Sequence, residues 1–154
     1  MPTWLVDPDN PRPPMDAVFA ARERLRGVAV RTPLLPLHGS DSIWLKPEVL
    51  QPTGSFKLRG IYNAVAAIGD AARAGGVSIV SSGNAAQALA WSARRFGVPA
   101  RAIVPANAPR AKIDAFVALG GSVELRDPAT VWDIFLDQAF MACLLYTSPS
   151  PRDS

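Results

Sequence analysis

The sequence predicts an α/β fold, because short strands alternate three times with helices in its second half. Residues 77–80 are a short apolar run, as the buried strands of a parallel sheet usually are, and the runs at residues 100–104 and 122–125 are predicted as the second and third strands. After a short loop, each run is followed by a segment in which apolar side chains recur at helical spacing. Short connections of this kind favour right-handed crossovers, so we expect a parallel sheet with helices on both faces.

The first 30 residues are expected to form an extended arm followed by one helix. Five of the first fourteen residues are proline, which disfavours regular structure there. Asp16 can cap a helix that ends near Gly27. Residues 34–37 are expected to form a short strand that Pro36 interrupts, and residues 42–46 alternate in polarity as a strand does.

The next helix follows a turn-rich segment at residues 51–55. The apolar side chains that repeat at helical spacing are Leu58, Ile61, Val65 and Ile68. We expect Gly75 and Gly76 to end this helix, because glycine is common directly after the last helical turn.

Three more helices complete the alternation. One spans residues 84–96, and a second opens at Pro109 and ends at the glycine pair 120–121. The third follows Asp127, which suits an N-cap position, with Pro128 as the first helical residue.

The composition excludes several classes of protein. The formal net charge of +3 is small and no basic block occurs, so nucleic acid is not an expected partner. A single cysteine and a single histidine exclude an internal disulfide and a cysteine- or histidine-rich metal site. No apolar stretch approaches the roughly 18 residues of a membrane span, and the start of the chain has no secretory pattern. We therefore expect a cytoplasmic protein without a metal and without a membrane partner.

Lys57 is the first candidate for a reactive residue. It lies at the start of a predicted helix, directly after the aromatic Phe56 and the glycine-containing turn at residues 51–55. The partial positive charge of a helix N-terminus disfavours a protonated amine and helps a lysine to act as a nucleophile. An aldehyde cofactor needs such an amine, and an adjacent aromatic ring can pack on a flat cofactor. The alternative is a solvated lysine at the start of an amphipathic helix.

Residues 81–88 are the second candidate. This segment follows a predicted strand at its carboxyl end and opens a helix, which is where open α/β sheets bind ligands. Backbone N–H groups there can point at a carboxylate or phosphate, and Ser82 and Asn84 add a hydroxyl and an amide. The alternative is that Ser82 or Asn84 only caps the helix.

Together, the two segments resemble the fold-type II pyridoxal-phosphate enzymes of the tryptophan synthase beta-like superfamily. The branch is that of threonine and serine dehydratases and serine racemase. Leu58 favours this branch, because threonine and cysteine synthases usually have aspartate directly after the lysine. The resemblance covers about residues 31 to 127, and its shorter matches are residues 31–34, 45–48, 111–113 and 120–123.

The resemblance implies roles for the residues around the cofactor. Lys57 corresponds to the catalytic lysine that binds pyridoxal 5'-phosphate and later takes the α-proton of the substrate. Phe56 corresponds to the aromatic residue beside the cofactor ring. Asn84 corresponds to the amide that hydrogen-bonds the 3-hydroxyl of that ring.

The resemblance also implies a substrate loop. Ser81, Ser82 and Gly83, with Asn84 at the end of the loop, are expected to receive the substrate carboxylate. Ser82 occupies the position at which racemases place a serine acid/base, so it is a second candidate catalytic residue. Ala85 stands where the family loop has histidine, and an alanine side chain cannot hydrogen-bond a substrate.

The function implied by the resemblance is that of a pyridoxal-phosphate-dependent ammonia-lyase, or dehydratase. Such an enzyme removes water and ammonia from threonine or serine and gives a 2-oxo acid. An amino-acid racemase of the same family and a non-catalytic binding domain are the alternatives. The full-length protein is expected to be a homo-oligomer.

The family fold also implies a division of the chain. Residues 31–74 are expected to begin the large cofactor domain, and residues 75–142 to form the small domain that closes over substrate. No glycine-rich phosphate loop and no partner for the pyridine nitrogen follow residue 127, so we expect an incomplete fold and an inactive fragment. Residues 143–154 resemble the translation of a sequencing adapter and are expected to be an artefactual tail.

Overall fold

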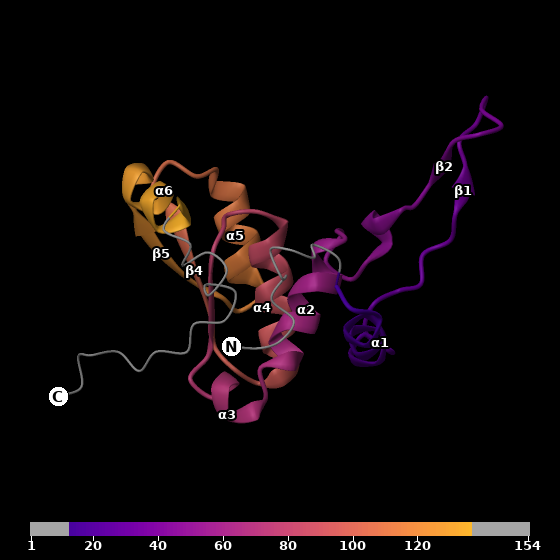
Figure 1. Ribbon diagram of the computed structural model, residues 1–154. Coiled ribbons are helices and arrows are strands. Elements are labelled where there is room, and N and C mark those ends of the chain that lie inside the picture. Colours follow the sequence, from indigo (N-terminus) through magenta and orange to yellow (C-terminus); the bar gives the residue numbers. More distant parts are fainter. Residues whose placement is uncertain (1–12, 137–154) are drawn as a thin grey trace.

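The computed structural model describes the backbone of residues 13–136 and the side chains of residues 13–134 (Figure 1). The adapter-like segment expected at residues 143–154 lies outside the described residues. The elements are α1 (Met15–Arg24), β1 (Leu35–Pro36), β2 (Trp44–Leu45), a 3-10 helix η1 (Glu48–Leu50), α2 (Lys57–Ala67), α3 (Asp70–Arg73), β3 (Val77–Val80), α4 (Asn84–Phe96), β4 (Ala100–Pro105), α5 (Arg110–Ala118), β5 (Ser122–Arg126) and α6 (Pro128–Leu136).

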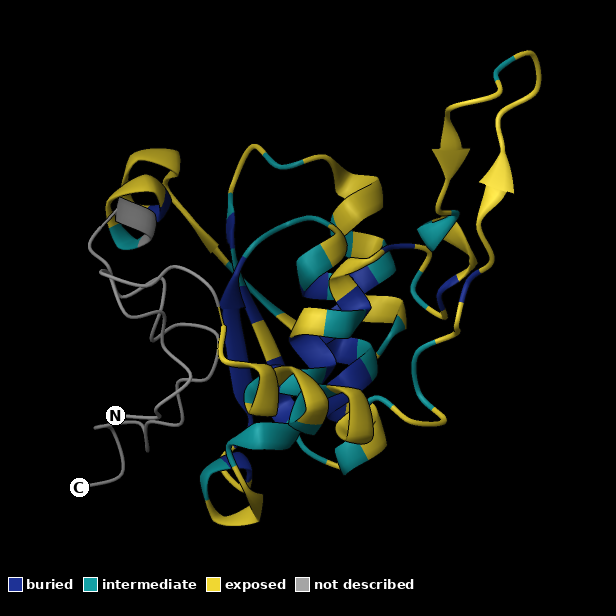
Figure 2. Ribbon diagram, turned by 45° about the vertical axis from the view of Figure 1, so that its right-hand side comes forward, coloured by how far each residue is buried: buried dark blue, intermediate teal, exposed yellow. Residues whose placement is uncertain are grey.

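The central sheet is parallel and has the strand order β3-β4-β5, which confirms the predicted α/β class. In its register Val77 lies beside Ala100, and Ala102 lies beside Val123. Helices α4 and α5 cover one face of the sheet and α6 lies on the other (Figure 1). All four residues of β3 are buried, which explains why its sequence is mainly apolar (Figure 2).

Helix α2 packs against α4 and forms an outer layer over the sheet (Figure 1). Ile61 and Val65 of α2 belong to the same buried cluster as the alanine-rich face of α4. In the same interface, the Tyr62 ring stacks on Phe96 at 5.2 Å between centroids and meets Trp91 edge-on at 6.2 Å. These ring contacts join the middle of α2 to the second half of α4.

The predicted end of the helix that begins at Lys57 was wrong. Helix α2 stops at Ala67, because Gly69 adopts a φ of 79° that only glycine takes up readily. A separate short helix, α3, precedes Gly76, whose φ is 95°. A Cβ on Gly76 would lie 3.0 Å from the Pro99 carbonyl oxygen, so this turn is also closely packed.

The N-terminal cap was predicted correctly for α6 but not for α1. Asp127 accepts a hydrogen bond at 2.9 Å from the backbone N–H of Ala129, which confirms it as a cap of α6. Asp16 does not cap α1: the N-cap is Pro14, and Asp16 lies in the first turn, where it accepts from Ala17 N–H at 2.8 Å.

Strands β1 and β2 form a small antiparallel hairpin that projects from the body of the molecule (Figures 1 and 2). Its apolar side chains are exposed, and they include Leu34, Leu35, Leu37, Ile43, Trp44 and Leu45. None of the helices in the described part of the chain has the length and apolarity that crossing a membrane requires.

Arg73 is a buried arginine that holds the end of α2. Its guanidinium donates hydrogen bonds to the carbonyl oxygens of Val65, at 2.9 Å, and Ala66, at 3.1 Å. It also pairs with Asp70 and lies 4.2 Å from the centroid of the Phe96 ring. Because these carbonyls have no later helical turn to satisfy them, the side chain takes the place of a C-cap.

We expect Arg73→Ala to lower the free energy of unfolding by about 2–3 kcal/mol, because two carbonyls lose their donors and the ring contact is lost. Denaturant unfolding followed by circular dichroism measures this change. The matched control is Arg95→Ala: Arg95 lies 5.0 Å from the Trp91 ring centroid, but it is exposed. An equal loss of stability in both variants would show that the carbonyl contacts of Arg73 contribute nothing.

Candidate functional site

The turn before α2 is held by its own buried polar groups. The amide of Gln51, only 3% exposed, accepts from Val30 N–H at 2.9 Å and donates to the Val30 carbonyl at 2.8 Å. Gly54, with a φ of 68°, donates its N–H to the Gln51 carbonyl at 2.7 Å. The buried Ser55 hydroxyl then accepts from Lys57 N–H at 3.2 Å. These contacts place Lys57 at the first position of α2, as the sequence predicts.

The amine of Lys57 is available to a ligand. The side chain is exposed, and its Nζ lies 4.9 Å from the centroid of the Phe56 ring. Between residues 13 and 134, that ring is the one partner of the amine, and no ion pair or hydrogen bond occupies it. Phe56 is itself 58% exposed, so its ring has a free surface. An amine in this setting can react with an aldehyde without first breaking a salt bridge.

A buried hydroxyl lies in the same turn. Within the described part of the chain, Thr53 Oγ1 is buried and has no hydrogen-bond partner. Buried hydroxyls are normally paired, so an unpaired one four residues before Lys57 is a polar group available to a bound molecule.

The second predicted segment forms the loop between β3 and α4. Ser81, Ser82 and Gly83 are half-buried, and Asn84 is exposed as the first residue of α4. Gly83 N–H donates to Ser81 Oγ at 3.2 Å, which closes the loop. The loop follows the carboxyl end of β3, the edge at which parallel sheets bind ligands.

The alternative that Ser82 or Asn84 only caps α4 was wrong. The N-cap is Gly83, and no side chain caps this helix. The backbone N–H groups of Asn84, Ala85 and Ala86 therefore have no hydrogen-bond partner among the residues that the structure describes. Free N–H groups at a helix N-terminus suit a carboxylate or phosphate. Ala85 itself is half-buried against the hydrophobic core.

The two segments lie at the starts of neighbouring helices, because α2 packs on α4. Contacts within each segment are direct: Lys57 with Phe56, and Ser81 with Gly83. In the range that the structure describes, no hydrogen bond or ion pair joins Lys57 to the loop that ends at Asn84.

The residues present fit part of a pyridoxal-phosphate group. A free amine, an exposed aromatic ring and an unpaired hydroxyl lie on one segment, while a side-chain amide and free backbone N–H groups lie on the other. A phosphate cradle is not found in residues 13–136, since the glycine pairs 75–76 and 120–121 follow helix ends. The same residues contain no group of three His, Cys, Asp or Glu side chains that could hold a metal.

Glu48 is a residue that the sequence-based prediction of the site missed. Its Oε1 accepts from Thr32 Oγ1 at 2.7 Å and from Arg59 Nη2 at 2.9 Å. Its Oε2 accepts from Arg59 Nε at 2.7 Å and from Gln51 Nε2 at 3.2 Å. Lys46 adds a longer ion pair at 3.9 Å. The hydrogen-bond partners lie between 3 and 16 residues away in sequence, so no local pattern reveals the cluster.

The hydrogen bonds from Arg59 lower the pKa of Glu48 from 4.5 to about 2. Burial opposes this shift, while Thr32 and the positive charges of Arg59 and Lys46 add to it. In return, the carboxylate raises the pKa of Arg59. The pair is therefore fully ionised at neutral pH.

This shift predicts a pH-dependent contribution to stability. A carboxyl group with a lowered pKa in the folded state stabilises that state fully above pH 4.5 and loses its contribution as the pH falls to about 2. We expect the difference in unfolding free energy between the native chain and Glu48→Gln to shrink by roughly 1–3 kcal/mol over this range. Denaturant titrations at several pH values measure it, and a difference that stays constant would contradict the assignment.

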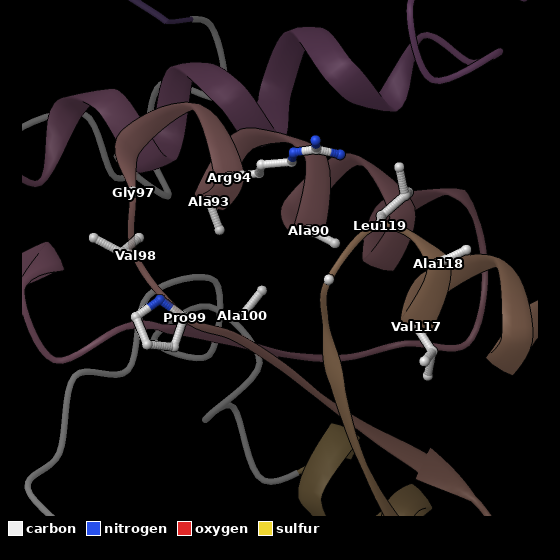
Figure 3. Close-up of a pocket in the computed structure, with 11 residues that line it drawn as sticks. Ala90, Ala93, Arg94, Gly97, Val98, Pro99, Ala100, Val117, Ala118 and Leu119 are labelled. Atoms are coloured by element: carbon white, nitrogen blue, oxygen red, sulfur yellow. The ribbon is translucent and has the colours of Figure 1, made fainter.

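A separate hollow lies at the opposite edge of the sheet (Figure 3). Its volume is about 510 Å³, and it is bounded by the end of α4, the start of β4 and the end of α5. Small apolar residues such as Ala90, Ala93 and Val117 line it, and Arg94 is its one charged lining residue (Figure 3). Because Ala100 begins β4 and parallel strands share their direction, this hollow cannot contain the loop after β3.

A protein-family model described as "Pyridoxal-phosphate dependent enzyme" matches residues 25–143. Serine racemase from Schizosaccharomyces pombe is 40% identical over 75% of this chain, and L-threo-3-hydroxyaspartate ammonia-lyase from Pseudomonas sp is 42% identical over 73%. The chain spans 37% of the length of each of these relatives. The structure of maize serine racemase superimposes with a TM-score of 0.72 at 28% identity, over 88% of this chain and 44% of that one.

Proposed function

Because the chain belongs to the family of pyridoxal-phosphate dependent enzymes, we propose that it carries the cofactor lysine and the substrate loop of an ammonia-lyase. The substrate would be a hydroxy-amino acid, threonine or serine, which loses water and ammonia to give a 2-oxo acid. The observation that carries the proposal is the free Lys57 amine at the start of α2, beside a helix whose first N–H groups are also free. This chain spans 37% of the length of these two relatives, so the activity of the whole protein is part of what we propose.

Three of the described residues would each have a separate role in binding the cofactor or in proton transfer. Lys57 would hold the aldehyde of the cofactor through Nζ and, once released, take the α-proton of the substrate. Phe56 would pack on the ring, and Asn84 would hydrogen-bond the 3-hydroxyl. When bound, pyridoxal phosphate supplies the electron sink that stabilises negative charge at the α-carbon.

The loop of Ser81, Ser82 and Gly83 would bind the substrate carboxylate. The free backbone N–H groups at the start of α4 support this role, because they offer donors and the positive end of a helix dipole. Holding the carboxylate there would orient the α-proton toward Lys57. Ala85 offers no side-chain hydrogen bond at this point, so the carboxylate would depend on backbone donors.

An amino-acid racemase is the second candidate, and Ser82 supports it. The hydroxyl of Ser82 makes no hydrogen bond within residues 13–134, so it is free to act as an acid or base. Relatives of both kinds match at similar identity, 40% for a racemase and 42% for an ammonia-lyase. Assays of the full-length protein for D-serine and for 2-oxo acid would separate the two, and neither product would indicate a non-catalytic binding domain.

The division of the chain also remains our proposal. The boundary between residues 74 and 75 falls between α3 and β3, so the lysine helix would belong to the large domain and the parallel sheet to the small one. The described residues include no phosphate loop, so we propose that this chain alone binds the cofactor weakly and has no turnover. The full-length protein would form a homo-oligomer.

The test of the proposed site is chemical labelling. Pyridoxal phosphate is added to the native chain, reduced onto lysine with borohydride, and located by peptide mass spectrometry. The three lysines are Lys46, Lys57 and Lys112, and the exposed amine of Lys112 has no partner among the described residues. We expect Lys57 to be labelled well above Lys112, whereas equal labelling would contradict a specific cofactor site.

A further inference from the structure

The first turn of α2 is tied to two other segments through one side chain. Arg59 follows Lys57 by two residues, and its guanidinium is held in place by both oxygens of Glu48. A third hydrogen bond runs from Arg59 Nη2 to the Val30 carbonyl at 2.8 Å. Two parallel bonds to a carboxylate fix the plane of a guanidinium, and the third bond fixes its position.

Glu48 in turn joins segments that are far apart in the sequence. Thr32 donates to one carboxylate oxygen and Gln51 to the other, and Gln51 also pairs with both backbone groups of Val30. The segment at residues 30–32, the 3-10 helix η1 and the first turn of α2 are therefore connected through a single carboxylate. Each acceptor site of that carboxylate is used, so the arrangement has one geometry.

The amine of Lys57, unlike the side chains of Arg59 and Glu48, is not fixed by hydrogen bonds or an ion pair among the described residues. Its ring contact is with Phe56, which is 58% exposed. The direction of the side chain is consequently set by the backbone of the first turn of α2. That backbone is held by the Ser55 hydroxyl on one side and by Arg59 on the other.

We propose that Glu48 is a positioning residue that acts through Arg59 to fix the direction in which Lys57 presents its amine. This role rests on the proposed function of Lys57 and extends it to a residue that touches neither substrate nor cofactor. If the pair only stabilised the fold, its loss would lower stability without changing the reactivity of Lys57 in molecules that remain folded.

Glu48→Gln tests the proposal, because the amide keeps the size of the side chain but turns a donor toward the donors of Arg59. Labelling by pyridoxal phosphate and borohydride is compared at Lys57 and Lys112 in the same molecules, under conditions in which the variant is folded by circular dichroism. We expect the ratio of Lys57 to Lys112 to fall by about tenfold, within the range of up to about 100-fold that a misplacement of 1 Å can cost.

Hydrogen exchange gives a second measurement that needs no cofactor. We expect the amides of residues 55–59 to exchange faster in Glu48→Gln, while those of α4 keep their rates. The matched control is Glu23→Gln, since Glu23 forms an exposed pair with Arg26 at 2.7 Å and should change neither measurement. If Glu48→Gln does not fold, Arg59→Lys serves in its place, because lysine keeps the charge but cannot make two parallel bonds.

An unchanged labelling ratio together with unchanged exchange at residues 55–59 would overturn the proposal, even if the variant unfolds more easily. A failure of the proposed function looks different. In that case the native chain itself shows no preference for Lys57 over Lys112, and the exchange measurement alone decides whether Glu48 positions the first turn of α2.

Discussion

Replacing Lys57 by alanine is expected to remove the preferred labelling of the chain by pyridoxal phosphate and the visible absorbance of lysine-bound cofactor. The reason is that Lys57 has a free Nζ beside an exposed aromatic ring, whereas Lys46 is engaged with the Thr32 carbonyl at 2.6 Å. Borohydride reduction followed by peptide mass spectrometry measures the loss. The residual labelling should match that of an ordinary exposed lysine such as Lys112.

The control for this experiment is Lys112→Ala, which removes an exposed lysine of α5 and should leave the label on Lys57 unchanged. Unfolding curves for both variants should coincide with that of the native chain, because neither side chain is buried. If Lys57→Ala kept the absorbance, Lys46 or Lys112 would hold the cofactor, and the proposed site would be wrong.

The parallel sheet and its helices could be predicted because their signals are local. Strand β3 is a buried run of four residues, and the helix predicted at residues 84–96 has the bounds of α4. The end of α2 was predicted less well, since Ile68 continues the apolar spacing while Gly69 breaks the backbone. The spacing of apolar residues predicts which side chains are buried. It does not predict that one glycine adopts a positive φ and ends the helix.

In the candidate site, too, features set by neighbouring residues could be predicted, whereas contacts between residues far apart in the sequence could not. Lys57 could be placed at a helix start because a glycine-containing turn precedes it within a few residues. The link from Glu48 to Arg59 spans 11 residues, and the link from Val30 to Gln51 spans 21. Contacts at such separations depend on how segments pack, so sequence periodicity cannot reveal them. The absence of a side-chain cap on α4 likewise became evident only from the loop geometry.

Gly121→Ala is expected to be the most destabilising single-methyl change in the core. A Cβ built on Gly121 would lie 2.1 Å from Cε1 of the Phe116 ring, far inside van der Waals contact. Phe116 is only 2% exposed and belongs to the buried hydrophobic cluster, so its ring is surrounded by core side chains. We expect the free energy of unfolding to fall by about 2–3 kcal/mol, because overpacking forces side chains away from their preferred rotamers.

The matched control is Gly60→Ala, which adds the same methyl group to a helix. Gly60 lies within α2, no atom lies within 4 Å of the position that a Cβ would take there, and its φ is not positive. Alanine there should raise the free energy of unfolding by about 0.5–1 kcal/mol, because it reduces the entropy of the unfolded chain. The two glycine variants should therefore move the denaturation midpoint in opposite directions. A midpoint for Gly121→Ala equal to that of the native chain would mean that the Phe116 ring does not pack against Gly121 in this way.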